Sequence, residues 1–168
     1  MIIAAATILA HAASDYSGGE NMESTYVPCE KCGKLNKLNE ISPEAQPVCG
    51  ACREPLKNYH DGVVEVSDTA LQNLLKGSPV PVITDFWAPW CGPCKMFAPV
   101  YSKTAVQYFG KAVFTKLNTD EFQLTAQDFK IRGIPTMVWF KGGVEVGRRS
   151  GAMDEASLKA LLDSIIAA

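Results

Sequence analysis

From residue 63 onward, apolar and polar residues follow the patterns of successive strands and helices. Strands are predicted over residues 63–66, 80–88, 113–117, 136–140 and 144–149, where β-branched and aromatic residues dominate. Helices are predicted over residues 67–77, 94–109 and 122–129 and after Asp154, from helical spacing and from cap residues. The order β-α-β-α-β-α-β-β-α indicates an α/β fold, in which a mixed central sheet carries helices on both faces.

The first 62 residues do not continue this pattern. Residues 1–22 open on an apolar run without Lys or Arg, so the positive region that starts an export signal is missing. We interpret them as a disordered extension or a misassigned start, with translation from Met22, and an export signal is the alternative. Residues 23–57 hold four cysteines and few large apolar side chains, so this short block needs a cross-link, such as a metal ion or disulfides, to fold. Residues 58–62 are interpreted as a linker to a domain of residues 63–168.

Composition narrows the function classes. The 168-residue chain has 47% hydrophobic and 20% charged residues, which is typical of a folded globular protein. Sixteen Lys and Arg against eighteen Asp and Glu give a net charge of -2, which disfavours a nucleic-acid binder. No apolar run is long enough to span a bilayer, so we expect no membrane segment.

All six cysteines occur in C-x-x-C pairs, at Cys29/Cys32, Cys49/Cys52 and Cys91/Cys94. A secreted disulfide scaffold scatters its cysteines so that they join distant segments, and no such scatter is present. Paired thiols two residues apart suit metal binding or dithiol redox chemistry instead. We therefore expect a cytoplasmic protein with a thiol function.

The third pair lies in Trp90-Cys91-Gly92-Pro93-Cys94, between the buried strand and the next helix. A thiolate attacks a disulfide faster than a thiol does, and a helix N-terminus favours the negative charge. Cys91 is therefore the expected nucleophile, and Cys94, one turn later, the resolving cysteine. Gly92 allows a substrate chain to approach, and Pro93 suits the first helical turn. Asp85, in the apolar strand, is expected to be buried, and burial would favour its neutral form.

These residues, with Gly133-Ile134-Pro135-Thr136 before a later strand, make residues 63–168 similar to the thioredoxin family. The resemblance implies the thioredoxin fold and a protein-disulfide reductase, because the dipeptide between the cysteines is Gly-Pro, as in the reductants of the family. It also implies that Asp85 accepts the proton of the resolving cysteine, that Lys116 lies near Asp85, and that Pro135 follows a cis bond. A purely structural Asp85 is the alternative.

The resemblance also implies the substrate site and the partners. The expected substrate-binding residues are Trp90, Gly92, Pro93, Ile134, Pro135 and Gly151, with the Ile134 backbone pairing with an extended substrate segment. A thioredoxin reductase would supply electrons, oxidised proteins would accept them, and the chain would act as a monomer. The Cys91–Cys94 disulfide is the expected redox group, and no organic cofactor is expected.

The first two pairs match the spacing of a zinc ribbon, C-x2-C, sixteen residues, C-x2-C. Cys29, Cys32, Cys49 and Cys52 would give one tetrathiolate Zn2+ site, which is structural because no open coordination position remains. Gly33 and Gly50 would permit the tight turns. Two disulfides or an iron site are the alternatives. Together with the dithiol domain, residues 27–168 resemble the zinc-bearing bacterial thioredoxins. Residues 1–21 and Pro89 depart from that pattern.

Two other functions are compatible with part of this sequence. The cysteine block could bind partners or nucleic acid, with the dithiol secondary, or the chain could be a redox-sensing chaperone that releases zinc on oxidation. The intact dithiol motif together with Asp85 and the Ile-Pro-Thr loop favours the reductase.

Overall fold

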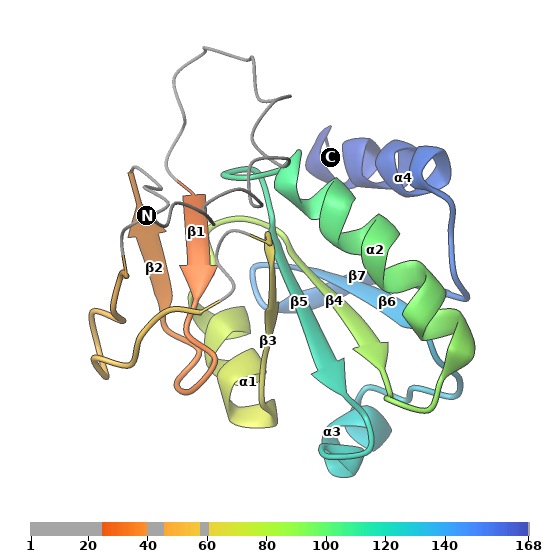
Figure 1. Ribbon diagram of the computed structural model, residues 1–168, viewed down its shortest axis with the longest axis horizontal. Helices are drawn as coiled ribbons and strands as arrows, with labels where there is room; N and C mark the ends of the chain where they lie inside the picture. Colours follow the sequence, from red (N-terminus) through yellow and green to blue (C-terminus); the bar gives the residue numbers. More distant parts are fainter. Residues whose placement is uncertain (1–24, 40–45, 58–60, 168) are drawn as a thin grey trace, which may run out of the picture.

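The computed structural model describes residues 25–39, 46–57 and 61–167 (Figure 1). The interpretations of residues 1–22 and of residues 58–60 lie outside the described residues. From residue 63 the elements follow the predicted order. They are β3 (Val63–Glu65), α1 (Asp68–Gly77), β4 (Val82–Trp87), α2 (Gly92–Val106), β5 (Val113–Asn118), α3 (Gln123–Asp128), β6 (Thr136–Lys141), β7 (Val144–Ser150) and α4 (Glu155–Ala167).

The five strands of this domain form one mixed sheet in the order β3-β5-β4-β6-β7. β3, β5 and β4 run parallel, β6 runs antiparallel to β4, and β7 runs antiparallel to β6. The carboxyl ends of β4, β5 and β7 therefore meet the start of β6 at one edge of the sheet. This edge brings four chain segments together, and the dithiol follows directly after β4.

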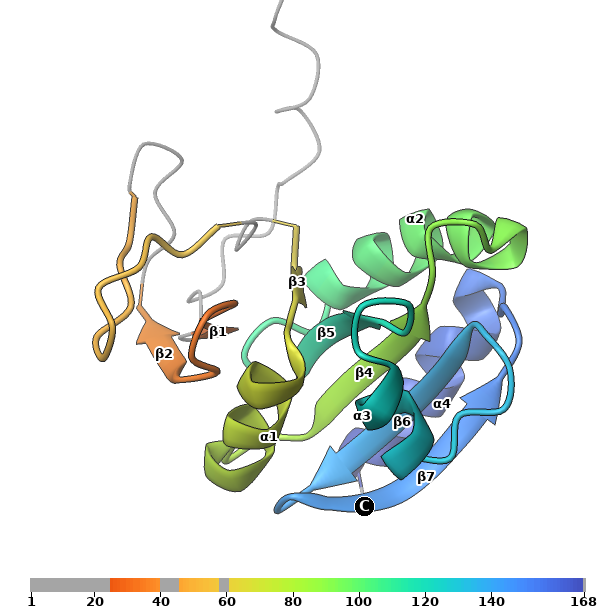
Figure 2. The ribbon, with the colours of Figure 1, turned by 90° about the horizontal axis from the view of Figure 1, so that it is seen from below.

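Helices cover both faces of the sheet, as predicted (Figure 2). On one face, Phe97 and Tyr101 of α2 and Leu158 and Leu162 of α4 are buried in a single cluster with sheet residues such as Ile83. On the other face, Leu71 and Leu74 of α1 form a second cluster with residues of β3, β4, β5 and β6. Two separate apolar layers hold the sheet rigid, so the segments at its edge have fixed positions.

Two of the predicted elements, α2 and β4, have other boundaries in the structure. α2 begins at Gly92 rather than Cys94, because the Cys91 side chain caps it by accepting the N–H of Cys94. It ends at Val106 rather than at residue 109, because the next two N–H groups bond three residues back and tighten the chain into turns. The strand predicted over residues 80–88 is ordered as β4 only over its central six residues.

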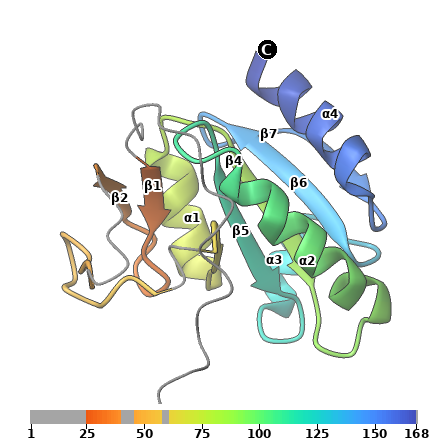
Figure 3. The same cartoon turned by 45° about the horizontal axis from the view of Figure 1, so that its top comes forward.

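The cysteine block forms a two-stranded antiparallel ribbon of β1 (Thr25–Pro28) and β2 (Leu35–Leu38) beside α1 (Figure 3). Four of its buried residues belong to the same apolar cluster as α1, namely Val27, Cys29, Cys49 and Leu56. Across the contact, the Asn73 side chain of α1 donates to the Cys32 carbonyl oxygen at 3.1 Å. The ribbon is thus packed against the larger domain as well as joined to it through the chain.

No helix within residues 25–39, 46–57 and 61–167 has the length and apolar character needed to cross a membrane.

Candidate active site

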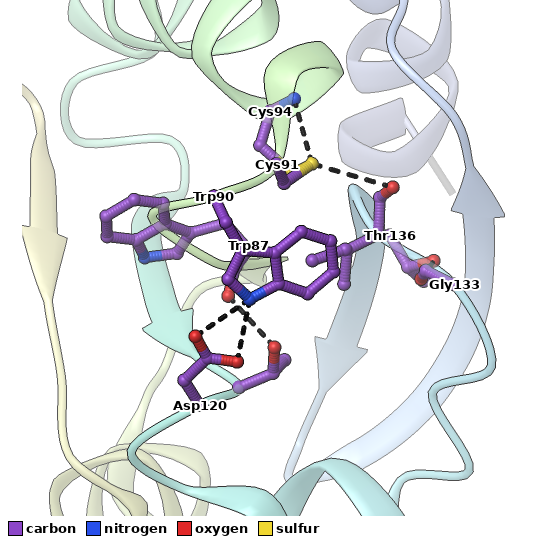
Figure 4. The surroundings of a disulfide bond; sticks show 9 residues. Trp87, Trp90, Cys91, Cys94, Asp120, Gly133 and Thr136 are labelled. Atoms are coloured by element: carbon purple, nitrogen blue, oxygen red, sulfur yellow. Dashed lines mark hydrogen bonds between the residues drawn. A yellow bond between two sulfur atoms is a disulfide. The ribbon is translucent and has the colours of Figure 1, made fainter.

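The dithiol lies at the first turn of α2, where Cys91 and Cys94 are joined by a disulfide (Figure 4). Both residues are buried, with exposed fractions of 3% and 2%. The Cys91 sulfur accepts the backbone N–H of Cys94 at 3.1 Å, so an unpaired donor of the helix N-terminus points at it. In the reduced state the same N–H and the helix dipole would stabilise a thiolate on Cys91.

Asp85 is buried in the middle of β4 with an exposed fraction of 3%. Burial raises the pKa of its carboxyl from 3.8 to about 7, and the positive charge of Lys116 opposes the rise. Its Oδ1 atom has no hydrogen-bond partner among the described residues, which leaves that oxygen free to take a proton. The strand context thus produces a carboxyl that titrates near neutral pH.

Lys116 lies in register with Asp85 on the neighbouring parallel strand β5. Its ammonium group is 3.6 Å from a carboxylate oxygen of Glu65 and 4.7 Å from the ring centre of Trp87. The lysine therefore supplies a positive charge beside the carboxyl, while its nearest charged neighbour is Glu65.

The loop before β6 faces the dithiol. The Ile134–Pro135 peptide bond is cis, in agreement with the expectation from the resemblance. The Ile134 carbonyl oxygen lies 3.8 Å from the Cys91 sulfur (Figure 4). Gly151, after β7, donates its N–H to the Pro135 carbonyl oxygen at 2.8 Å, and the Thr136 hydroxyl donates to the Gly133 carbonyl oxygen at 2.7 Å. These bonds fix the loop against the sheet edge.

Trp90 forms the opposite side of the site, and 69% of its surface is exposed. Its indole N–H donates to the carboxylate of Asp120, with N–O distances of 2.8 and 3.1 Å, so the ring is held in place despite its exposure. Gly92 and Pro93 are also exposed beside the dithiol. Apart from Gly92, its two chain neighbours and the adjoining backbone of α2, no described atom lies within 4 Å of the point where a Gly92 side chain would begin, which leaves room for a substrate chain.

Asp120 is a site residue that the sequence analysis missed. It follows β5, whose carboxyl end lies next to that of β4, and polar residues at the ends of neighbouring parallel strands often line a site. The position of Asp120 directly after a predicted strand could therefore have indicated a site residue from the sequence. Its bond to Trp90 spans thirty residues and depends on strand pairing.

The four N-terminal cysteines also converge, because their sulfurs all lie within 4.8 Å of one another. The sulfurs of Cys29 and Cys52 are 3.6 Å apart, and those of Cys32 and Cys49 are 3.7 Å apart. In a tetrahedral site with Zn–S bonds of about 2.3 Å, neighbouring sulfurs are about 3.8 Å apart. The distances therefore fit a tetrathiolate ion site, and all four cysteines are free thiols here rather than disulfides.

The two cysteine turns have the same hydrogen bonds. The backbone carbonyl oxygens of Cys29 and Cys49 each accept the N–H of the residue four positions later, Gly33 and Arg53, at 2.9 and 3.0 Å. Gly33 and Arg53 both adopt a positive φ, at 70° and 64°. The expectation that Gly50 takes this role was wrong, because the left-handed residue of each turn comes directly after the second cysteine.

Glycine is required at the first turn by packing. A Cβ on Gly33 would lie 2.0 Å from the backbone oxygen of Ala70 in α1, whereas the equivalent Arg53 is exposed. Gly33 is therefore the point at which the ribbon touches the helix backbone.

Known proteins are similar to this chain mainly over the domain that carries the dithiol. A family model described as thioredoxin matches residues 62–164. Thioredoxin of Synechocystis sp. is 45% identical over 102 residues, which is 61% of this chain and 95% of the relative. The chloroplastic M-type thioredoxin of Pisum sativum is 45% identical over 101 residues, 60% of this chain and 59% of the relative.

Thioredoxin C-3 of Corynebacterium nephridii is 35% identical over 137 residues, which is 82% of this chain and 92% of the relative. A match of that length in a 168-residue chain begins no later than about residue 32, so it reaches into the cysteine block. The similarity to this relative extends beyond the dithiol domain.

Proposed function

The chain belongs to the thioredoxin family, and on that premise we propose that it reduces disulfides of target proteins through Cys91 and Cys94. It is a protein-disulfide reductase, as its family membership indicates. One observation carries the assignment of the dithiol. The Cys91 sulfur accepts an N–H at the start of α2 and faces the Ile134 carbonyl, where an incoming chain could pair.

The proposed reaction has two steps. The Cys91 thiolate attacks one sulfur of the target disulfide, so that a Cys91–target disulfide forms, the target disulfide breaks, and one target thiolate leaves and takes up a proton. Cys94 then loses its proton and attacks the Cys91 sulfur, which forms the Cys91–Cys94 disulfide and releases the second target thiol. The target gains two electrons from the dithiol and two protons. One of these protons is the one that Cys94 loses, and the other comes from the solvent, which received it when Cys91 ionised.

Asp85 is the proposed acceptor of the Cys94 proton. A general base works best when its pKa is near the ambient pH, and burial raises the pKa of this carboxyl to about 7. Lys116 is proposed to tune that pKa through its charge rather than to touch the substrate, because its ammonium group lies at Glu65 and Trp87.

The substrate site is proposed to lie between two rims. Trp90, Gly92 and Pro93 form one rim, and Ile134, Pro135 and Gly151 form the other. An extended target segment would pair with the Ile134 backbone as an added strand, which supplies affinity that depends little on target sequence. Family members are generally reduced by thioredoxin reductase, and we propose such an enzyme as the electron donor.

The ribbon is proposed to hold one Zn2+ through Cys29, Cys32, Cys49 and Cys52, as in the thioredoxin-2 type of zinc-bearing thioredoxin. The sulfur spacing supports this proposal, as does the Ala51 N–H, which lies 3.4 Å from the Cys49 sulfur and would stabilise a thiolate. When bound, the ion would supply structural cross-linking and no catalysis, because four sulfurs fill its coordination sphere.

We also propose the module boundaries of residues 23–57 and 63–168, a monomeric state and a cytoplasmic location. A cytoplasmic location agrees with the proposed zinc site, which needs four reduced thiols. The contacts of the ribbon with α1 support a fixed position of the two modules, so residues 58–62 join modules that already touch.

Substitution of the two dithiol cysteines tests the proposal. Cys94→Ser should trap a disulfide-linked complex with a protein substrate, whereas Cys91→Ser should give neither complex nor turnover. The measurements are non-reducing electrophoresis and insulin reduction with NADPH and thioredoxin reductase. Cys52→Ser is the matched control, because it removes a thiol outside the dithiol. Normal turnover by Cys94→Ser would contradict the resolving role.

A further inference from the structure

An open cavity of about 310 Å3 lies next to the Ile134–Pro135 loop. Its walls come from the turn after α3, the start of β6 and the end of β7. Six residues, which we call the basic pocket, line it: Lys130, Ile131, Arg132, Thr136, Arg148 and Ser150.

A short chain of contacts joins the basic pocket to the dithiol. The Thr136 and Ser150 hydroxyls lie 2.8 Å apart in the wall of the pocket. Thr136 directly follows Pro135, and the carbonyl oxygen of Ile134 is 3.8 Å from the Cys91 sulfur. Figure 4 shows Thr136 and Gly133 on the segment that faces the dithiol. A substrate segment lying along this loop would therefore place its neighbouring side chains near the pocket.

The pocket carries an uncompensated positive charge. The Arg148 guanidinium is neutralised by Glu145, with two N–O distances of 2.6 Å, and it is anchored by the Phe129 carbonyl oxygen at 2.8 Å. Lys130 and Arg132 are exposed and form no ion pair with any residue that the structure describes. Two cations thus remain available beside two hydroxyl groups.

The other rim of the site has the opposite charge. Asp120, which holds the Trp90 indole, and the neighbouring Glu121 both lie after β5. Coulombic attraction and repulsion at the two rims therefore distinguish between target segments by charge and by direction. An acidic side chain is favoured on the β7 side and disfavoured on the Trp90 side.

We propose that the basic pocket is a specificity subsite, which binds the carboxylate of an Asp or Glu close to the target's reducible cysteine. This inference rests on the proposed function, because it places the target segment against the Ile134 loop. Lys130 and Arg132 supply both the charge and the N–H donors for this carboxylate, because the hydroxyl groups of Thr136 and Ser150 are already hydrogen-bonded to Gly133 and to each other. The substrate class is thus a protein disulfide flanked by acidic residues.

Paired peptide substrates test the subsite. One set of disulfide-linked peptides carries a single Glu at positions one to three on either side of the cysteine, and the matched set carries Gln. The rate constant for reduction by the pre-reduced full chain is measured by stopped flow, so that no reductase contributes. At one position at least, the Glu peptide should react about 3- to 10-fold faster at low salt, and high salt should remove the difference.

Variants identify the residues that cause this preference. With Lys130→Gln and Arg132→Gln combined, the Glu and Gln peptides should react at equal rates, whereas Arg132→Lys should keep the preference. Lys111→Gln removes an exposed cation in the turn after α2 and should also keep it. Equal rates for both peptide sets with the unmodified chain, or a preference that survives the double substitution, would overturn the subsite. If neither peptide set is reduced, the proposed function itself fails.

Discussion

Replacement of Asp85 by asparagine removes a carboxyl group whose neutral form is favoured by burial. The side chain is only 3% exposed, and Oδ1 has no partner among the described residues. The charge of Lys116 favours the ionised form but does not outweigh burial. An amide of nearly the same shape should therefore fit the site without bringing a charge into it.

The pKa values set the size of the effect. The carboxyl has a pKa of about 7 in the folded chain, against an ordinary value of 3.8. One pKa unit corresponds to about 1.4 kcal/mol, so ionising Asp85 in the folded state costs about 4 kcal/mol of stability. Because the folded pKa is raised, the folded state binds more protons between these two values. The contribution of Asp85 to the free energy of unfolding should be largest below about pH 4. It should fall as the pH rises to about 7 and should then stay constant.

Asp85→Asn should therefore be more stable than the parent chain in alkali, by up to about 4 kcal/mol, and should lose this advantage in acid. The measurement is urea unfolding of the oxidised protein, for both chains, across about pH 4 to 9. Contributions from Asp154 and Glu155, whose pKa values are lowered by hydrogen bonds to Ser157 and Lys103 respectively, occur in both chains and cancel.

Asp128→Asn provides the control, since it makes the same substitution at an exposed position of α3. If the stability difference between Asp85→Asn and the parent were the same at about pH 5 and pH 8.5, the carboxyl would not titrate near pH 7. The same titration should appear in catalysis. The resolving step should accelerate as pH rises through about 7 in the parent and should be slower and flatter in Asp85→Asn, if this carboxylate accepts the Cys94 proton.

Three further predictions concern the ribbon and the exposed rim. Gly33→Ala should lower the free energy of unfolding by about 1–3 kcal/mol, because its Cβ would lie 2.0 Å from the Ala70 oxygen. Arg53→Ala is the control at the equivalent, exposed position, and it should lower the free energy of unfolding by less than about 1 kcal/mol. Cys29→Ser or mild peroxide should release Zn2+, measured with a chromogenic chelator, and should lower the melting temperature while substantial insulin reduction remains. Complete loss of activity with the dithiol still reduced would contradict separable modules. Trp90→Ala should raise KM for a protein disulfide about 3- to 10-fold with a smaller change in kcat, and an unchanged KM would exclude the indole from the substrate site.

Local sequence determined the elements and the chemistry of the dithiol. The order of strands and helices from residue 63 is readable because each element has its own period and its own cap, such as Ser67, whose side chain accepts the N–H of Ala70. The C-x-x-C pairs are readable because their chemistry requires two thiols one turn apart. Burial of Asp85 could be predicted from its neighbours in β4, since an almost wholly apolar strand lies in the middle of a covered sheet.

Only the tertiary structure decided what these elements meet. The bond from Trp90 to Asp120, the contact of Gly33 with Ala70 and the position of Ser150 in the basic pocket with Lys130 each join segments that lie far apart in the sequence. Such contacts depend on which strands are neighbours and on how closely two backbones approach. Residue periodicity carries no information about either, because it records the environment of a side chain and not the identity of its partner. The packing of β4 against β5 and β6, and of the ribbon against α1, therefore completes the site.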